Sequence, residues 1–123
     1  MPLLLEQNDD VAALLELQLA THGEELHHVR TVEGLVQHLG GCDHDSVLIG
    51  GDIAHDTWNW VFGAMRDGSR VTLWSSHPGS RIPRPPTERQ IRTELLLGMP
   101  RLPALVSRLL PEGQRSGGVR TIS

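Results

Sequence analysis

"SVLIGG", residues 46–51, is the strongest strand signal in this chain of 123 residues. Its apolar run ends at two glycines, as expected of a strand that is buried on both faces of a parallel sheet. The period then changes, and one helical face before a turn at 67–68 collects the apolar residues Trp58, Val61, Phe62 and Met65. A buried strand followed by an amphipathic helix is the repeating unit of an α/β sheet.

The same alternation precedes this unit. "PLLLE" (2–6) predicts a buried strand, and "ELHHVRT" (25–31) predicts a weaker, shorter one. A helix follows each strand: the first begins at Asp9 or Asp10 and ends at Gly23, and the second begins at Thr31. The second helix ends at Gly40 and Gly41. The expected apolar faces are Val11, Leu14, Leu15, Gln18 and Leu19 in the first helix, and Val32, Leu35, Val36 and Leu39 in the second.

The pattern weakens after a fourth predicted strand at 70–76. "HPGSRIPRPP" (77–86) contains four prolines and predicts an extended loop. Thr87 and Gln90 form a capping box for a short helix of about two turns, and "ELLLG" (94–98) predicts the fifth strand. Pro103 suits the first turn of a last helix. The apolar face of that helix is Leu102, Leu105, Val106, Leu109 and Leu110.

Five strand and helix units predict a doubly wound, flavodoxin-like parallel sheet with strand order 2-1-3-4-5 and a shortened fourth helix. A chain of this length, with 38% hydrophobic residues, suits one domain, which we assign to residues 1–111. Residues 112–123, "EGQRSGGVRTIS", predict a flexible tail.

Charge and composition exclude several classes of function. The net charge is −4, and all 11 basic residues other than histidine are arginines spread along the chain, so we expect no nucleic-acid binding. No apolar run has the length of a membrane span, and the N-terminus lacks the pattern of a signal peptide. Cys42 is the single cysteine and forms no internal disulfide. We therefore expect a cytoplasmic protein without membrane association.

Residues 2 to about 110 resemble the receiver domains of two-component response regulators. "PLLLEQNDDVAALLELQLATHG" is similar to the opening strand, acidic loop and first helix of that family, and "HDSVLIGGDIA" to its third strand and the following loop. "AMRDGSRVTLWSS" resembles its third helix, turn and fourth strand. "LLLGMPRLPALVSRLL" resembles the fifth strand and last helix. The resemblance implies a CheY-like form of the predicted fold and a role in signal transduction.

In that family an aspartate after the third strand accepts a phosphoryl group from a histidine kinase. The aspartate and an acidic pair hold Mg²⁺, and a lysine and a hydroxyl bind the phosphoryl oxygens. On the ungapped match the acidic pair falls on Glu6 and Gln7, the acceptor on Gly50, the hydroxyl on Ser75 and the lysine on Met99. Gly50 offers no nucleophile, Gln7 no charge, and the chain contains no lysine. We therefore expect an aspartate-less pseudo-receiver, with no catalytic residue, cofactor or metal.

Asp52 offers an alternative, because a residue two places along a strand returns to the same face. A small shift of the third strand relative to the family pattern would make Asp52 the phosphoacceptor, with Glu6 as the main Mg²⁺ ligand. That shift breaks the ungapped match through "WNWVFGAMRDG" and replaces neither the missing charge at Gln7 nor the lysine. A third hypothesis, a metal-dependent phosphohydrolase or nuclease, would use Glu6, Asp52 and Asp56.

Histidines and acids elsewhere give weaker signals. "CDHD" (42–45) precedes the third strand, whereas His55 and Asp56 follow it. About five strand residues therefore hold these two groups farther apart than the ligands of one metal ion can be. His27 and His28 alternate on a weak strand, and we expect them to be a surface pair.

The three tryptophans and the receiver resemblance indicate where binding partners could contact the chain. Trp58 and Trp60 are two places apart on a helix, so one should be buried and the other exposed as a binding anchor. Trp74 could fill the space left by Gly50. The resemblance implies protein partners, such as a regulator or kinase of the same pathway, and a homodimer contact on the face of helix four, strand five and helix five.

Overall fold

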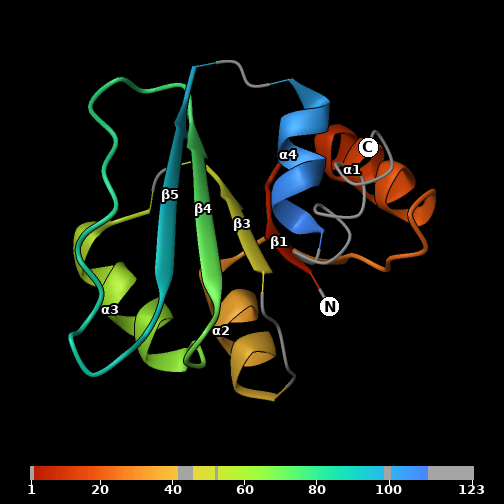
Figure 1. Ribbon diagram of the computed structural model, residues 1–123. Helices are drawn as coiled ribbons and strands as arrows, with labels where there is room; N and C mark the ends of the chain where they lie inside the picture. Colours follow the sequence, from red (N-terminus) through yellow and green to blue (C-terminus); the bar gives the residue numbers. More distant parts are fainter. Residues whose placement is uncertain (1, 42–45, 52, 99–100, 111–123) are drawn as a thin grey trace, which may run out of the picture.

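The computed structural model describes residues 2–41, 46–51, 53–98 and 101–110. Within them the elements run in the order β1 (Leu3–Leu5), α1 (Asp9–Ala20), β2 (His27–Val29), α2 (Val32–Gly41), β3 (Ser46–Gly50), α3 (His55–Ala64), β4 (Arg70–Ser75), β5 (Arg92–Leu97) and α4 (Leu102–Leu109) (Figure 1). All strand pairs are parallel, and the strand order is β2-β1-β3-β4-β5. The predicted flavodoxin-like α/β sheet is confirmed.

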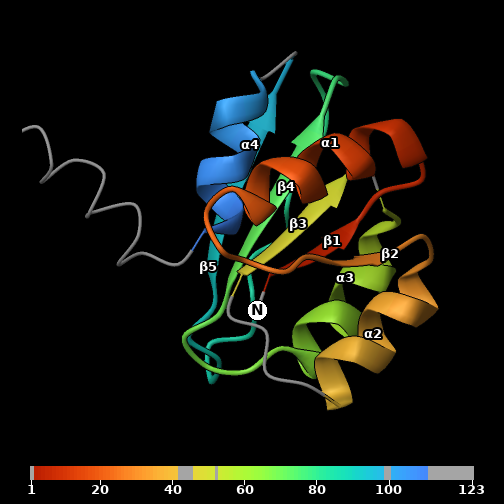
Figure 2. The same ribbon diagram turned by 90° about the vertical axis from the view of Figure 1, so that its right-hand side faces the viewer.

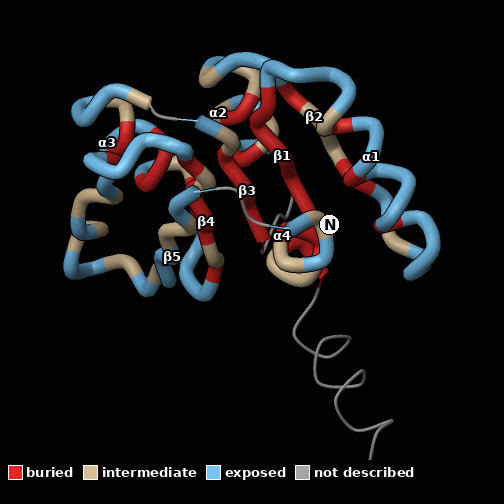
Figure 3. Tube along the Cα trace, turned by 90° about the horizontal axis from the view of Figure 1, so that it is seen from above, coloured by how far each residue is buried: buried red, intermediate tan, exposed pale blue. Residues whose placement is uncertain are grey.

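Helices cover both faces of the sheet, α1 and α4 on one and α2 and α3 on the other (Figure 2). Neighbouring side chains of a strand point to opposite faces. Leu4 and Leu48 therefore pack with α1 and α4, whereas Leu3, Leu5 and Ile49 pack with α2 and α3. Figure 3 shows the buried stretch of β1, β3 and β4 between these layers. The core is thus divided by the sheet into two clusters.

The first helix differs from its prediction in two details. Its N-cap is Asn8, not Asp9 or Asp10, and the Asn8 side chain accepts hydrogen bonds from the backbone N–H groups of Asp10 and Val11. The buried stripe is Ala12, Leu15 and Leu19. Leu14, expected on the apolar face, is exposed because it lies one position outside this stripe.

The predicted short helix after Thr87 is wrong, because residues 76–91 contain turns and extended chain but no helix. The Arg89 N–H donates to Pro86 O in a local turn, whereas the Gln90 N–H, which the capping box would direct to Thr87, donates to the Asp67 side chain. The Arg89 guanidinium donates to the carbonyls of Gly63 and Met65 at the end of α3. Tertiary contacts therefore replace the capping box.

The remaining boundaries shift by a few residues. β2 is limited to His27–Val29, and β5 begins at Arg92, two residues before the predicted "ELLLG" strand. α4 has Pro103 in its first turn and buries Leu105, Val106 and Leu109, as predicted. Among the described residues, no helix is long and apolar enough to cross a membrane.

Candidate functional site

The carboxyl ends of β1, β3 and β4 meet at one edge of the sheet, where ligands of such sheets bind. Leu5 is paired with Ile49, and Gly50 with Trp74, which places Glu6 next to Gly50. A cleft of about 300 Å³ opens at this edge. Its lining residues are Glu6, Gly50, Gly51, Trp74, Ser75, Ser76 and His77. Three of the predicted site residues, Glu6, Gly50 and Ser75, are thus brought together in what we call the edge cleft.

The Glu6 carboxyl group occupies the place of a side chain at Gly50. A Cβ atom on Gly50 would overlap Oε2 of Glu6 and lie 2.9 Å from its Cδ, closer than unbonded carbon atoms approach. A residue with an acceptor carboxylate at position 50 would therefore require Glu6 to move. The prediction that Trp74 fills this space is wrong, because the nearest atoms belong to Glu6 and Leu5.

Backbone contacts hold Glu6 in position. Its N–H donates to Val29 O at 3.1 Å, and its carbonyl oxygen lies 2.7 Å from Nε2 of His28. Its side chain is directed by the N–H of Asn8, which donates to Oε1 at 3.1 Å. Glu6 is only 8% exposed. Among the described residues, Oε2 accepts no hydrogen bond, which is unusual for a buried carboxylate.

Gly50 and Gly51 are each glycine for a different structural reason. Gly50 leaves room for Glu6, whereas Gly51 has a φ of 97°, a conformation that residues with a Cβ rarely adopt. The N–H of Gly51 donates to Trp74 O at 2.7 Å, so the chain turns away from the sheet while still paired to β4. The sequence pattern alone treats both glycines as a lost acceptor site.

Ser75 is buried and already hydrogen bonded. Its Oγ lies 2.6 Å from Oγ of Ser80 and accepts the N–H of His77 at 3.0 Å. The hydroxyl therefore ties the loop after β4 back to the strand. Sequence reasoning missed Ser80, although the Pro-Gly turn at 78–79 was a signal that the chain folds back there.

Trp74 forms one wall of the edge cleft. Its indole Nε1 donates to Gly98 O at 3.3 Å, and the ring packs against the core cluster beneath α1 and α4. By strand alternation it shares a sheet face with Gly50 and Glu6. An aromatic side chain and a buried carboxyl group therefore belong to the same cleft.

Gln7 is separated from Glu6. It lines a second cleft of about 360 Å³, between the loops that follow β1, β2 and β3, together with Arg30, Thr31 and Gly50. The predicted acidic pair is therefore divided between two clefts. Met99 and Asp52 lie outside the described residues, as do Cys42 to Asp45.

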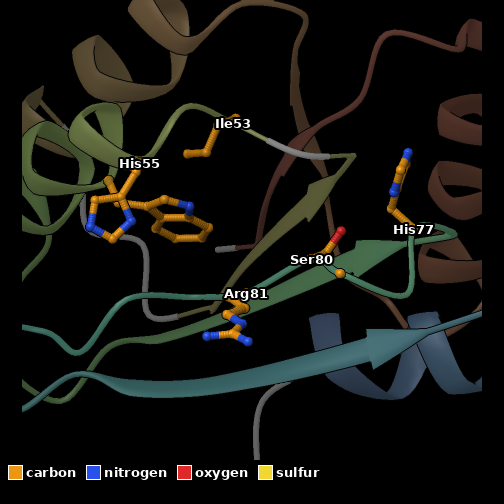
Figure 4. Close-up of a pocket in the computed structure, with 7 residues that line it drawn as sticks. Ile53, His55, His77, Ser80 and Arg81 are labelled. Atoms are coloured by element: carbon orange, nitrogen blue, oxygen red, sulfur yellow. The ribbon is translucent and has the colours of Figure 1, made fainter.

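A third cleft of about 290 Å³ lies between the start of α3 and the loop after β4 (Figure 4). It is lined by Ile53, His55, Trp58, His77, Gly79, Ser80 and Arg81. Figure 4 shows His55 and His77 on opposite sides of this cleft. In the described part of the chain, no group of three or more His, Cys, Asp or Glu residues could hold a metal ion.

The predicted surface pair His27 and His28 is half-buried, and each residue has a partner. His27 Nδ1 lies 3.5 Å from Nδ1 of His38 in an edge-to-face ring contact, and His28 contacts the Glu6 carbonyl. The predicted difference in burial between the two tryptophans is confirmed, because Trp58 is buried and Trp60 is 49% exposed, whereas the role of Trp60 as a binding anchor stays a prediction.

Comparison with known proteins gives no matching family model, curated protein or solved structure. The structure itself defines the class of protein: a parallel α/β sheet with a cleft at the carboxyl ends of its strands. Inferences about its function rest on the residues of that edge.

Proposed function

We propose that this chain is a non-enzymatic signalling module of the receiver type that does not accept phosphate at β3 and acts by binding protein partners. The observation that carries this proposal is the Glu6 carboxyl group in the place of an acceptor side chain at Gly50. Phosphoryl transfer needs a carboxylate nucleophile and cations that screen the developing charge. The edge cleft instead places a carboxyl group where a phosphoryl group would have to enter.

The other groups at this edge agree with the proposal. The Ser75 hydroxyl, which receivers use for a phosphoryl oxygen, is engaged with Ser80 and His77. No lysine exists in the chain to neutralise a phosphoryl group. A regulator without a covalent switch responds through partner or ligand binding that shifts its populations.

The resemblance to receivers suggests a partner surface at the far edge of the sheet. Helix four of that surface is absent here, so the loop 76–91, β5 and α4 would form it. Leu97 of β5 is 49% exposed and supplies an apolar contact there. We expect the partners to be proteins of a signalling pathway, or a second copy of the chain, in the cytoplasm.

Incubation of the full chain with Mg²⁺ and a small phosphodonor tests the proposal. We expect the intact mass to show no phosphoryl adduct, because position 50 has no nucleophile. An adduct that is lost in Asp52→Ala and kept in Asp56→Ala would instead establish Asp52 as the phosphoacceptor and contradict the proposal. Metal-dependent phosphatase or nuclease turnover lost in Asp52→Ala would contradict its non-enzymatic character.

A further inference from the structure

The edge cleft contains a buried acid with an unused acceptor atom. Glu6 is 8% exposed, its Oε1 is bound by the N–H of Asn8, and its Oε2 lies over Gly50 without a hydrogen bond from any described residue. Burial of a carboxylate is costly unless the group is paired, so an unpaired oxygen beside a cleft points to a missing cationic or hydrogen-bond-donating group.

The residues around Glu6 restrict what could supply that group. The chain has no lysine, and the lining residues that the structure describes include no arginine, which disfavours an anionic ligand such as phosphate. Among the described residues of that lining, Glu6 is the single carboxylate, whereas Mg²⁺ prefers six oxygen ligands in octahedral geometry. Trp74 supplies an aromatic surface, which attracts organic cations and stacks well on a planar guanidinium.

We propose that the edge cleft binds an organic cation, a guanidinium or primary ammonium group, with Glu6 Oε2 as the acceptor and Trp74 as the aromatic wall. The inference deepens the proposed function and rests on it, since it names the chemistry that a partner or small ligand presents to the site. The cleft volume of about 300 Å³ lies at the lower end of ligand pockets and suits one side-chain-sized group.

Gly50 is part of this site through its missing side chain. Because a Cβ at position 50 would displace the Glu6 carboxyl group, Gly50→Ala is expected to weaken cation binding without changing any charge. The backbone of Gly50 does not have a positive φ, so alanine introduces no conformational strain there. This variant tests the carboxyl position, whereas Glu6→Gln tests its charge.

The test is an NMR titration of the full chain with N-acetyl-arginine amide, read at the indole N–H of Trp74. Trp74→Phe assigns that signal among the three tryptophans. We expect a saturable shift with the arginine probe and none with N-acetyl-citrulline amide, its neutral isostere. Glu6→Gln should weaken binding by about tenfold or more, since hydrogen bonds to charged groups are the strong ones. Glu16→Gln, at an exposed site on α1, makes the same charge change and should leave binding unchanged.

Several outcomes would overturn the proposal: equal shifts with citrulline, no saturable shift, or the same loss in Glu16→Gln as in Glu6→Gln. The proposal would also be overturned if Mg²⁺ alone shifted the Trp74 signal and prevented binding of the arginine probe. If Glu6→Gln disturbs folding, Gly50→Ala tests the position of the carboxyl group with the acid intact, and unchanged binding in Gly50→Ala would then overturn the proposal. Failure of cation binding leaves the phosphodonor experiment unaffected, so the two proposals fail separately.

Two further probes distinguish the sources of the cation. Tighter binding of the capped peptide Gly-Arg-Gly than of butylguanidine would indicate an arginine side chain of a protein partner. Tighter binding of butylguanidine would indicate a free small molecule, because the peptide backbone would then be excluded. Both results agree with the proposed site.

Discussion

β3 and β5 each contain three consecutive apolar residues but differ in their surroundings. β3 is buried along nearly its whole length, between two strands and two helical layers. β5 has three leucines, yet all its residues are exposed or half-buried, because it lies at the edge of the sheet. An apolar run therefore predicts a strand, while the number of neighbours decides how much that strand contributes to the core.

The loop before β5 reinforces this difference. In place of a fourth helix, an extended segment runs past α3 and packs Ile82 and Ile91 against the core (Figure 1). Its polar attachment comes from Arg89, which binds the carbonyls at the end of α3. The loop before β5 is therefore held by a few apolar and polar contacts, whereas β3 is surrounded by a continuous core.

The largest expected effect is at the centre of β3. Leu48→Ala removes a side chain that is 0% exposed and should lower the free energy of unfolding by about 2–5 kcal/mol. Leu97→Ala, in β5, should change it by less than about 0.5 kcal/mol. Urea unfolding of both variants measures the comparison. Equal losses would show that β5 is as buried in solution as β3.

A smaller effect is expected at the loop attachment. Arg89→Ala removes the donors to Gly63 O and Met65 O and should cost about 1–2 kcal/mol of stability, with faster hydrogen exchange in residues 76–91. Arg84→Ala, at an exposed site of the same loop, is the matched control and should change neither quantity. Unchanged exchange in Arg89→Ala would contradict the role of this attachment.

The smallest effect distinguishes two glycines at strand ends. Gly50→Ala should cost about 1 kcal/mol and much less in a Glu6→Ala background, because the overlap is with Glu6. Gly98, after β5, has a φ of 92° and open space around it, so Gly98→Ala should cost about 1–2 kcal/mol in both backgrounds. A double-mutant cycle by urea unfolding measures this coupling. Additive losses for Gly50 and Glu6 would contradict their contact.

Much of the fold could be predicted because its signals are local. The apolar runs of β1, β3 and β4 and the periodicity of α2, α3 and α4 lie in consecutive residues, and their alternation restricts the topology. The prediction of a helix after Thr87 failed because a capping box is a weak preference, and here the hydrogen bonds of the Arg89 side chain and the Gln90 backbone N–H to distant groups override it.

The candidate site was predicted only in part. The edge of the sheet and three of its residues follow from strand ends, but the separation of Gln7 from Glu6, the pairing of Ser75 with Ser80 and the wall formed by Trp74 do not. These contacts join segments far apart in the sequence, or depend on the direction of a loop. No local pattern contains that information.

The sequence by itself determined the order of the five strands, the absence of lysine and the lack of a side chain at position 50. Only the tertiary structure decided what stands in that empty place. Glu6 and Gly50 are 44 positions apart in the printed sequence, and parallel pairing of β1 with β3 brings them together. The physical reason is that a glycine only creates space, whereas the neighbouring strand determines which side chain fills it.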